Sequence, residues 1–274
     1  MKRVLSLCLC FFCVVTLYAD GFYGADGWSA IQSDYRYFYS GDTFKAMALS
    51  TVLAGSLANS SLDQRFQDFY QEQIRSERLN KISSVVKPFG SGRYVLPVMF
   101  LFSAIFSDTS GVGEWASLSS RAYLVGAPLM LMGQRVLGAS RPGETSHGSH
   151  WRPFNDANAV SGHAFIGAVP FLVMAKLLDD YPAFSALAYA ASVAVAWSRV
   201  NDDSHYLSQA FLGCFLAWQA VDAVFRTRDD NRQGVGLGLS SFGTDSVSLS
   251  QKKGVVFKPL LLSAGTGMMM TYTF

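Results

Sequence analysis

The chain has 274 residues, of which 50% are hydrophobic and 15% are charged, against about 25% charged residues in ordinary soluble domains. This balance favours a membrane protein or a deeply buried helical bundle. The formal net charge of +2 and the lack of a basic stripe interleaved with aromatic residues argue against a nucleic-acid partner.

Residues 1–19 have the pattern of a secretory signal. Lys2 and Arg3 precede an apolar stretch, Val4–Leu17, which ends at an acceptable cleavage site. We therefore expect a signal peptide here, with an uncleaved N-terminal anchor as the alternative. Three of the four cysteines lie in this stretch, so the mature chain has no internal disulfide and Cys214 is predicted to be a small core residue.

Residues 20–43 are rich in Gly, Tyr, Asp and Ser, which predicts an irregular exported N-terminal segment. Residues 44–57 are rich in Ala and Leu and are expected to be helical. Asp63–Lys81 is more polar, with aromatic and aliphatic residues at helical spacing. It is predicted to form one amphipathic helix that lies either on the core or on a membrane surface.

Five apolar runs follow: Tyr94–Phe106, Ala122–Gln134, Ala157–Ala175, Tyr181–Ser198 and Ser204–Val221. The last three have 18 or 19 residues and approach the length of about 20 that a membrane-spanning helix needs, whereas the first two fall short. The sequence thus predicts an all-α fold, a bundle of about six core helices that is embedded in a membrane or dips into one. This helical domain is expected to cover residues 44–226.

The composition changes at residue 227, where a short charged stretch predicts a linker. Beyond it, apolar residues alternate as in strands: Val235, Leu237, Leu239, Val247, Leu249, Met268, Met270, Tyr272 and Phe274. Residues 227–274 are therefore expected to form a linker and a β-like tail, either two small hairpins or a loosely ordered segment. The tail is too short to close a membrane barrel, which needs at least eight strands of about ten residues.

Two arginines and two histidines lie at predicted helix ends, in the order Arg141, His163, Arg199 and His205. Arginine holds phosphate through paired, charge-assisted hydrogen bonds, and histidine can attack or protonate near neutral pH. If the helix ends converge, these side chains form a compact cationic pocket suited to phosphoryl chemistry.

Ser161 is a favourable N-cap for the helix that begins there, and Gly162 permits close approach of the backbone. The free amides of such a helix start favour an anion. At the last helix, Asp203 or Ser204 is expected to be the cap, which would put His205 in the first turn.

The order and spacing of these residues resemble the type 2 phosphatidic acid phosphatase superfamily, related to vanadium haloperoxidases and class A acid phosphatases. The family pattern is Lys-x6-Arg-Pro, then Pro-Ser-Gly-His, then Ser-Arg-x5-His-x3-Asp. The matching segments are Gln134–Pro142, Val160–His163 and Ser198–Gln209. The resemblance covers roughly Phe44–Phe225.

The resemblance implies that His205 attacks phosphorus to form a phosphohistidine, and that His163 protonates the leaving alcohol and then activates water. It also implies a set of groups that bind the equatorial phosphate oxygens: Arg141, Arg199, and the backbone amides of Ser161 and Gly162. Because the arginines supply positive charge, neither a metal nor a cofactor is expected.

Three positions depart from the pattern. Gln134 stands where the family has lysine, Gln209 where it has the aspartate that orients the nucleophile, and Val160 where it has proline. Arg135, on another face of its helix, is a candidate for replacing the missing cation. For the missing carboxylate, the neighbouring candidates are Asp202 and Asp203.

His147 and His150 lie in the loop Glu144–Asn158 and have a spacing that could suit a metal, but no cysteine or carboxylate cluster accompanies them. They are expected to line the mouth of the pocket or to face solvent.

The predicted function is a cell-envelope phosphatase. It would hydrolyse a phosphomonoester or diphosphate of a lipid or isoprenoid, at a membrane and with its site facing the exterior. Two alternatives stay open: a soluble periplasmic acid phosphatase, and a phosphate- or lipid-binding relative with little turnover.

Overall fold

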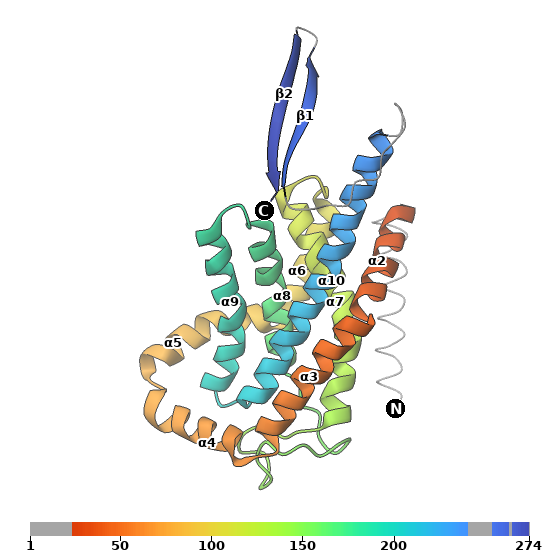
Figure 1. The fold of residues 1–274 in the computed structure, drawn as a ribbon. Coiled ribbons are helices and arrows are strands. Elements are labelled where there is room, and N and C mark those ends of the chain that lie inside the picture. The colour runs from red at the N-terminus through yellow and green to blue at the C-terminus, as the bar shows by residue number, and fades with distance from the viewer. Residues whose placement is uncertain (1–23, 241–253, 263–264, 274) are drawn as a thin grey trace. The chain divides into compact units, whose positions relative to one another are not determined.

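The computed structural model describes residues 24–240, 254–262 and 265–273. Contacts divide the chain into two units, Met1–Arg232 and Gln233–Phe274. The first unit is all-α, as predicted (Figure 1). The helical elements are α2 (Gly24–Phe38), α3 (Gly41–Ala58), α4 (Ser61–Phe69), the π-helical turn η1 (Tyr70–Ile74), α5 (Glu77–Val86), the 3-10 turn η2 (Lys87–Gly90), α6 (Gly92–Ile105), α7 (Gly111–Leu137), α8 (Gly162–Leu177), α9 (Pro182–Asn201) and α10 (Leu207–Ser240). The last of these runs past the end of the first unit at Arg232.

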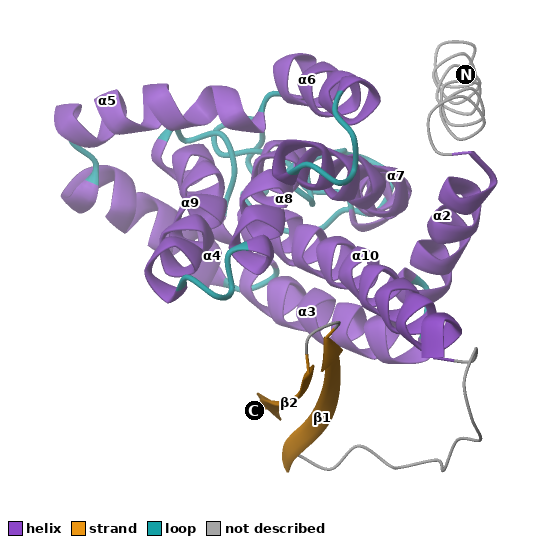
Figure 2. Cartoon of the chain, turned by 90° about the horizontal axis from the view of Figure 1, so that it is seen from above, coloured by secondary structure: helices purple, strands orange, loops and turns teal. Residues whose placement is uncertain are grey.

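The core is centred on α8, which lies among α6, α7, α9 and α10 (Figure 2). Its inward side chains, such as Phe165 and Val169, are fully buried. Two glycines allow close packing within the core. A Cβ on Gly126 of α7 would lie 2.8 Å from the Phe165 ring, and one on Gly167 would lie 2.5 Å from Val195 of α9. These close approaches place the ends of the core helices near one another.

The expectation of an irregular segment over residues 20–43 is wrong, because Gly24–Phe38 forms α2. Its buried positions include Ile31, Asp34 and Phe38, a helical spacing. The reason is a contact distant in sequence. Arg121 of α7 donates from Nε and Nη2 to the two oxygens of Asp34, at 2.8 and 2.6 Å. This buried ion pair holds a polar-looking segment against the bundle.

The prediction of one helix over Asp63–Lys81 is wrong. This segment comprises most of α4, then η1 and the first half of α5. The chain leaves helical geometry at Arg75, whose ψ is 135°. Ser76 then caps the next helix, since its hydroxyl accepts a hydrogen bond from the backbone amide of Leu79.

Among the described residues, two helices are long and apolar enough to cross a membrane: α9, and α10 from Leu207 to Gln233. The third predicted candidate, Ala157–Ala175, is shorter than its apolar run. Its helix begins only at Gly162 and has 16 residues, because the preceding residues belong to the loop that contains the site motif.

The predicted linker after residue 226 is also wrong, since α10 continues to Ser240. Arg228 and Arg232, one turn apart, both reach Glu114 of α7, at 2.9 and 2.7 Å. The charges that suggested a linker therefore fasten the helix to its neighbour. The strand predicted from Val235 is helical as well.

In the second unit, β1 (Gly254–Leu262) pairs with β2 (Gly265–Thr273) as an antiparallel hairpin, with Phe257 opposite Met270. This confirms the strand character predicted for residues 268–273. Other sequence-based predictions lie outside the described residues: the signal peptide over residues 1–19, and the alternating positions Val247, Leu249 and Phe274.

Candidate active site

Four helix ends meet at one end of the bundle, the lower end in Figure 1. There α7 and α9 end, and α8 and α10 begin. The amide of Ser161 donates to the carbonyl of Gln209 at 2.9 Å. Gly213 permits this approach, because a Cβ there would lie 2.4 Å from the carbonyl oxygen of Ser161. The start of α8 is thus fixed against the first turns of α10.

His205 is almost fully buried, and its Nδ1 lies 2.8 Å from Oε1 of Gln209. Two further bonds fix the orientation of that amide. Its Nε2 donates to the carbonyl of Ser140 at 2.7 Å, and its Oε1 accepts from the amide of Tyr206 at 3.3 Å. The oxygen therefore faces the imidazole, so Nδ1 carries the proton and Nε2 has the free lone pair.

Burial lowers the pKa of His205 to about 4, although the hydrogen bond that His205 donates to Gln209 opposes this shift. The positive charges of Arg141 and Arg199 and the neighbouring His163 lower it further. His205 is consequently neutral at ordinary pH, the state a nucleophile needs.

The cap predicted for α10 is wrong. Asp203 has φ of +53° and lies in the turn before the helix, which begins at Leu207. Its cap comes from α4, where Asp63 accepts from the amide of Ser208 at 3.2 Å. His205 therefore precedes the first turn of the helix.

Arg199 lies at the end of α9 and is buried. Its Nε and Nη1 have no hydrogen-bond acceptor within the described part of the chain. The side chain of Asp202 is 3.9 Å from Nη1. The carbonyl of Arg199 accepts from the amides of Ser204 and His205, at 2.9 and 3.2 Å, so one tight turn holds the arginine beside the histidine.

Arg141 lies in the loop after α7 and is exposed. Its Nε donates to Oδ1 of Asn158 at 3.1 Å, and a carboxylate oxygen of Glu144 is 3.9 Å from it. Arg141 is therefore an exposed cation, whereas Arg199 is buried.

The start of α8 carries Ser161, Gly162 and His163. Ser161 caps the helix, because its hydroxyl accepts from the amide of Ala164 at 3.3 Å. Since the Ser161 amide already donates to Gln209, the first-turn amides without a partner in the described residues are those of Gly162 and His163. This differs from the prediction that the Ser161 amide binds phosphate.

His163 is partly buried. Burial, together with the positive charges of Arg199, Arg141 and Lys87, lowers the pKa of this histidine below its ordinary value. The charges of Arg141 and Arg199 thus lower the pKa of both histidines.

Gln134 donates from Nε2 to the carbonyl of Val160 at 2.9 Å, so it supports the loop that leads into α8. Arg135 is exposed on the neighbouring face of α7, and its side chain is not among those that hold the site loop. Thus Gln134 holds the backbone where the family pattern has a cation.

Neither aspartate suggested as a replacement for the missing carboxylate serves His205. Asp202 accepts from Ser83 at 2.7 Å and lies 2.9 Å from Nζ of Lys87. Asp203 accepts from Nε2 of Gln67 at 2.6 Å. Burial alone would raise the pKa of Asp202, but the hydrogen bonds from Ser83 and Lys87 hold it below its usual range.

Sequence reasoning missed Lys87, which borders the same site. A cleft of about 530 Å³ includes Lys87, His163 and Asp202 in its lining. No spacing rule connects a lysine on η2 with motifs that begin some 45 residues later; its place follows from tertiary packing alone.

His147 and His150 lie in the exposed loop, where Nδ1 of His150 is 2.9 Å from the carbonyl of His147. Across the described residues, no three His, Cys, Asp or Glu side chains are grouped as metal ligands.

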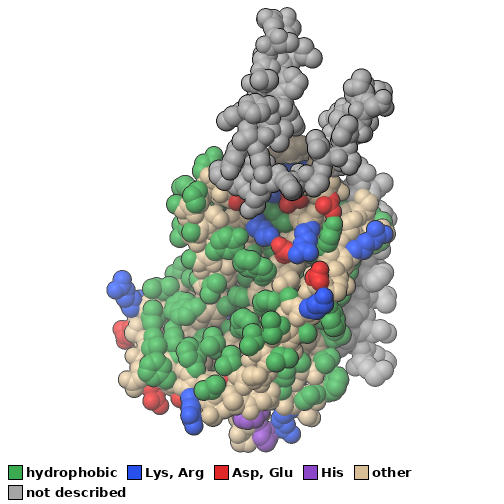
Figure 3. All heavy atoms as spheres, in the orientation of Figure 1, with side chains coloured by type: hydrophobic (Ala, Val, Ile, Leu, Met, Phe, Trp, Pro, Cys, Tyr) green, Lys and Arg blue, Asp and Glu red, His purple; other side chains and the backbone are tan. Residues whose placement is uncertain are grey.

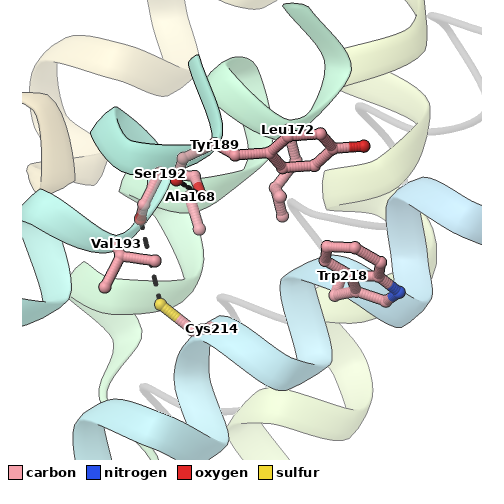
Figure 4. A pocket seen from close by; sticks show the side chains of 7 residues that line it. All are labelled: Ala168, Leu172, Tyr189, Ser192, Val193, Cys214 and Trp218. Carbon is pink, nitrogen blue, oxygen red and sulfur yellow. Dashed lines mark hydrogen bonds between the residues drawn. The ribbon is translucent and has the colours of Figure 1, made fainter. Parts of the chain in front are cut away.

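A separate pocket lies among α8, α9 and α10, and Figure 4 shows its lining side chains, including Tyr189, Cys214 and Trp218. The Cys214 thiol points to the carbonyl of Ser192, 3.9 Å away. No charged side chain lines this pocket, so it has none of the groups that phosphoryl chemistry needs.

Residues 122–233 match the family model of the PAP2 superfamily. The matched region contains every predicted site residue, from Gln134 to Gln209. One solved structure, the first transmembrane PAP2 type phosphatidylglycerolphosphate phosphatase from Bacillus subtilis, matches with 16% identity and a TM-score of 0.40, over 85% of this chain and 98% of that chain. No curated protein matches.

Proposed function

We propose that this chain is a phosphoric-ester hydrolase that acts on a lipid or isoprenoid phosphate at a membrane. The observation that carries the proposal is the buried guanidinium of Arg199, whose Nε and Nη1 lack acceptors in the described residues and which shares a turn with His205. A buried cation with open donors is costly unless a ligand supplies acceptors. A phosphate group supplies two in the matching geometry.

In the proposed first step, the Nε2 lone pair of His205 forms a bond to phosphorus while the bond from phosphorus to the leaving oxygen breaks. His163 donates its proton to that oxygen, which departs as an alcohol. Gln209 acts as the positioning residue, because it holds the proton of His205 on Nδ1.

Arg199, Arg141 and the free amides at the start of α8 would bind the equatorial oxygens and stabilise the charge of the transition state. In the second step, water loses a proton to His163 and bonds to phosphorus as the bond to His205 breaks, which releases inorganic phosphate. The arginines supply the positive charge, so the proposed reaction requires neither a metal ion nor a cofactor.

An apolar groove supports a lipid substrate. It has a volume of about 390 Å³ and is lined by side chains of α3, α7 and α10, among them Met47, Met132 and Leu216. Val160 also lines it, directly before the site residue Ser161. An acyl or prenyl chain in this groove would therefore end near the phosphate pocket.

The surface supports membrane contact. In Figure 3, hydrophobic side chains cover the middle of the face in view, and charged ones lie mostly toward its ends. α4 is amphipathic with its apolar side outward: Leu62 and Phe69 are 56% and 54% exposed, whereas Asp63 and Gln67 are buried. An outward apolar helix face next to the site fits a helix lying in a membrane interface.

The N-terminal signal pattern supports a cell-envelope location with the site facing the exterior. A soluble periplasmic acid phosphatase is the alternative within the same chemistry. Fractionation separates the two, because the membrane form requires detergent for release and the soluble form does not.

A catalytically weak binding protein is the second candidate, favoured by the uncharged Gln134 and Gln209. In that case Gln134→Lys should raise phosphate release sharply from a very low level. High turnover by the unmodified protein would exclude this candidate.

The direct test is phosphate release by purified protein from phosphatidate, an isoprenyl diphosphate and a soluble aryl phosphate. Acid-labile, base-stable labelling of the protein from a labelled substrate reports the phosphohistidine. His205→Ala should abolish both signals, and His150→Ala, at an exposed loop histidine, should retain both. Undiminished turnover in His205→Ala would refute the assigned nucleophile.

A further inference from the structure

The cleft beside His163 contains groups that the proposed mechanism does not use. It lies where α5, η2 and α6 face the start of α8 and the turn after α9. Charged and polar side chains line it: Arg75, Asn80, Lys87, Tyr94, His163 and Asp202. Of these, only His163 has a role in the reaction described above.

Close packing holds Lys87 next to the site. A Cβ on Gly90 would lie 2.7 Å from the carbonyl oxygen of His163. The glycine therefore allows the backbone of η2 to pack directly against the backbone of α8. Nζ of Lys87 is 2.9 Å from Oδ2 of Asp202, and the same oxygen is 3.9 Å from Nη1 of Arg199. One carboxylate therefore links Lys87 to the buried guanidinium of the phosphate pocket.

Arg75 brings a second cation to the cleft. Its Nε donates to Oδ1 of Asn80 at 3.0 Å, and its Nη1 donates to Oε1 of Gln71 at 2.9 Å. Both partners are neutral amides, which orient the guanidinium without cancelling its charge. The cleft thus has more positive than negative charge, since Asp202 is the one carboxylate among its lining residues.

The position of His163 decides which part of a substrate enters the cleft. In an in-line displacement, the attacking atom and the leaving oxygen lie on opposite sides of phosphorus. The proton donor must reach the leaving oxygen. With His205 attacking and His163 donating, the leaving group extends past His163, a residue that lines the cleft.

We propose that Lys87 and Arg75 form an anion-binding subsite for the leaving group, so that the preferred substrate carries a second phosphate-type anion next to the phosphate that is removed. This inference rests on the proposed function, because the roles of His205 and His163 define the leaving-group side. Both a diphosphate and a headgroup with an adjacent phosphodiester have the required chemistry.

The kinetic test compares two lipids with identical acyl chains, diacylglycerol diphosphate and phosphatidate, in mixed micelles. The kcat/KM ratio of diphosphate to monophosphate should fall about tenfold in Lys87→Gln and in Arg75→Gln, as expected for one lost charged hydrogen bond, and mainly through KM. Lys81→Gln, at an exposed lysine of α5 outside the cleft, should keep the wild-type ratio. An unchanged ratio in Lys87→Gln, or equal losses on both lipids, would overturn the subsite.

A binding measurement separates the subsite from catalysis. By calorimetry, the non-hydrolysable methylenediphosphonate should bind more tightly than methylphosphonate, and Lys87→Gln should reduce that preference about tenfold. If the wild type releases no phosphate but binds the diphosphonate more tightly, only the proposed function is refuted. If it releases phosphate but binds both phosphonates equally, only the subsite is refuted. If it does neither, both are refuted. Should Lys87→Gln not fold, Arg75→Gln gives the same test at a side chain bonded to neutral amides.

Discussion

Gln209 holds His205 through an amide, and replacing that amide by the isosteric carboxylate tests the arrangement. In Gln209→Glu, one carboxylate oxygen would lie where Nε2 now donates to the carbonyl of Ser140 at 2.7 Å. The carboxylate oxygen and the carbonyl oxygen of Ser140 are both acceptors and repel each other at that distance. Gln209 is fully buried, so water cannot separate them. Losing the bond and leaving the carbonyl unpaired costs about 1–3 kcal/mol. At about 2 kcal/mol, the middle of this range, the Tm of a domain of this size falls by roughly 4–8 °C.

The deficit should depend on pH. A protonated Glu can donate to Ser140, so folding raises the pKa of the introduced carboxyl above its unfolded value of about 4.3. The variant is therefore closest to wild type below that pH and loses stability as pH rises through the raised pKa. Thermal unfolding of detergent-purified protein, measured from about pH 4 to about pH 8, reports this stability deficit on both sides of the raised pKa. Gln134→Glu, which faces a similar carbonyl at a partly exposed position, is the matched control and should lose less. A deficit that is absent, or equal at all pH values, would refute the reasoning.

Three further predictions follow from the geometry. The pH profile of kcat/KM should peak at acid pH, because the reaction needs neutral His205, whose pKa is about 4, and protonated His163, whose pKa lies below 6.5. Activity should rise as pH passes the first value and fall as it passes the second. Gly90→Ala should cost about 1–3 kcal/mol in thermal unfolding and reduce kcat, since its Cβ would press on the backbone of His163. Asp34→Asn should cost about 3–5 kcal/mol in denaturant unfolding, because Arg121 would keep a buried charge without its anion.

Each of these predictions has a control. An optimum at or above neutral pH would contradict the assigned roles of the two histidines. Gly41→Ala adds a Cβ with nothing within 4 Å and should change stability by less than about 1 kcal/mol. Asp42→Asn removes a fully surface-exposed pair with Lys45 and should have no measurable effect. Equal losses in the Gly90 and Gly41 variants, or in the two aspartate variants, would sink the packing and burial arguments.

The sequence predicted the helices whose apolar runs are continuous, and it placed the four motif residues at helix ends. Those features are local, because hydrophobic periodicity and capping act within a few residues. It failed at α2, whose buried face includes Asp34. The partner that makes this burial favourable, Arg121, is 87 residues away. It failed again at the charged end of α10, which looks like a linker until Glu114 of α7 is placed beside it.

The site could be predicted as a set of residues but not as a network. Four-residue spacing on one helix predicts the histidine–glutamine contact, but His205 lies in the turn before α10 and makes the contact from there. That the same glutamine amide also reaches Ser140 depends on where the loop after α7 returns. Lys87 reaches the site only because Gly90 allows η2 to touch His163, and no spacing rule contains that contact.

The capping of α10 by Asp63 shows that the supports of the site begin well before the region that matches the family model. The family match starts at residue 122, yet Asp63 holds the first turn of α10, Ser83 holds Asp202, and Gly90 supports His163. A protein trimmed to residues 122–233 would keep every motif and lose these supports. The early helices are therefore part of the frame that holds the start of α10, Asp202 and His163 in place.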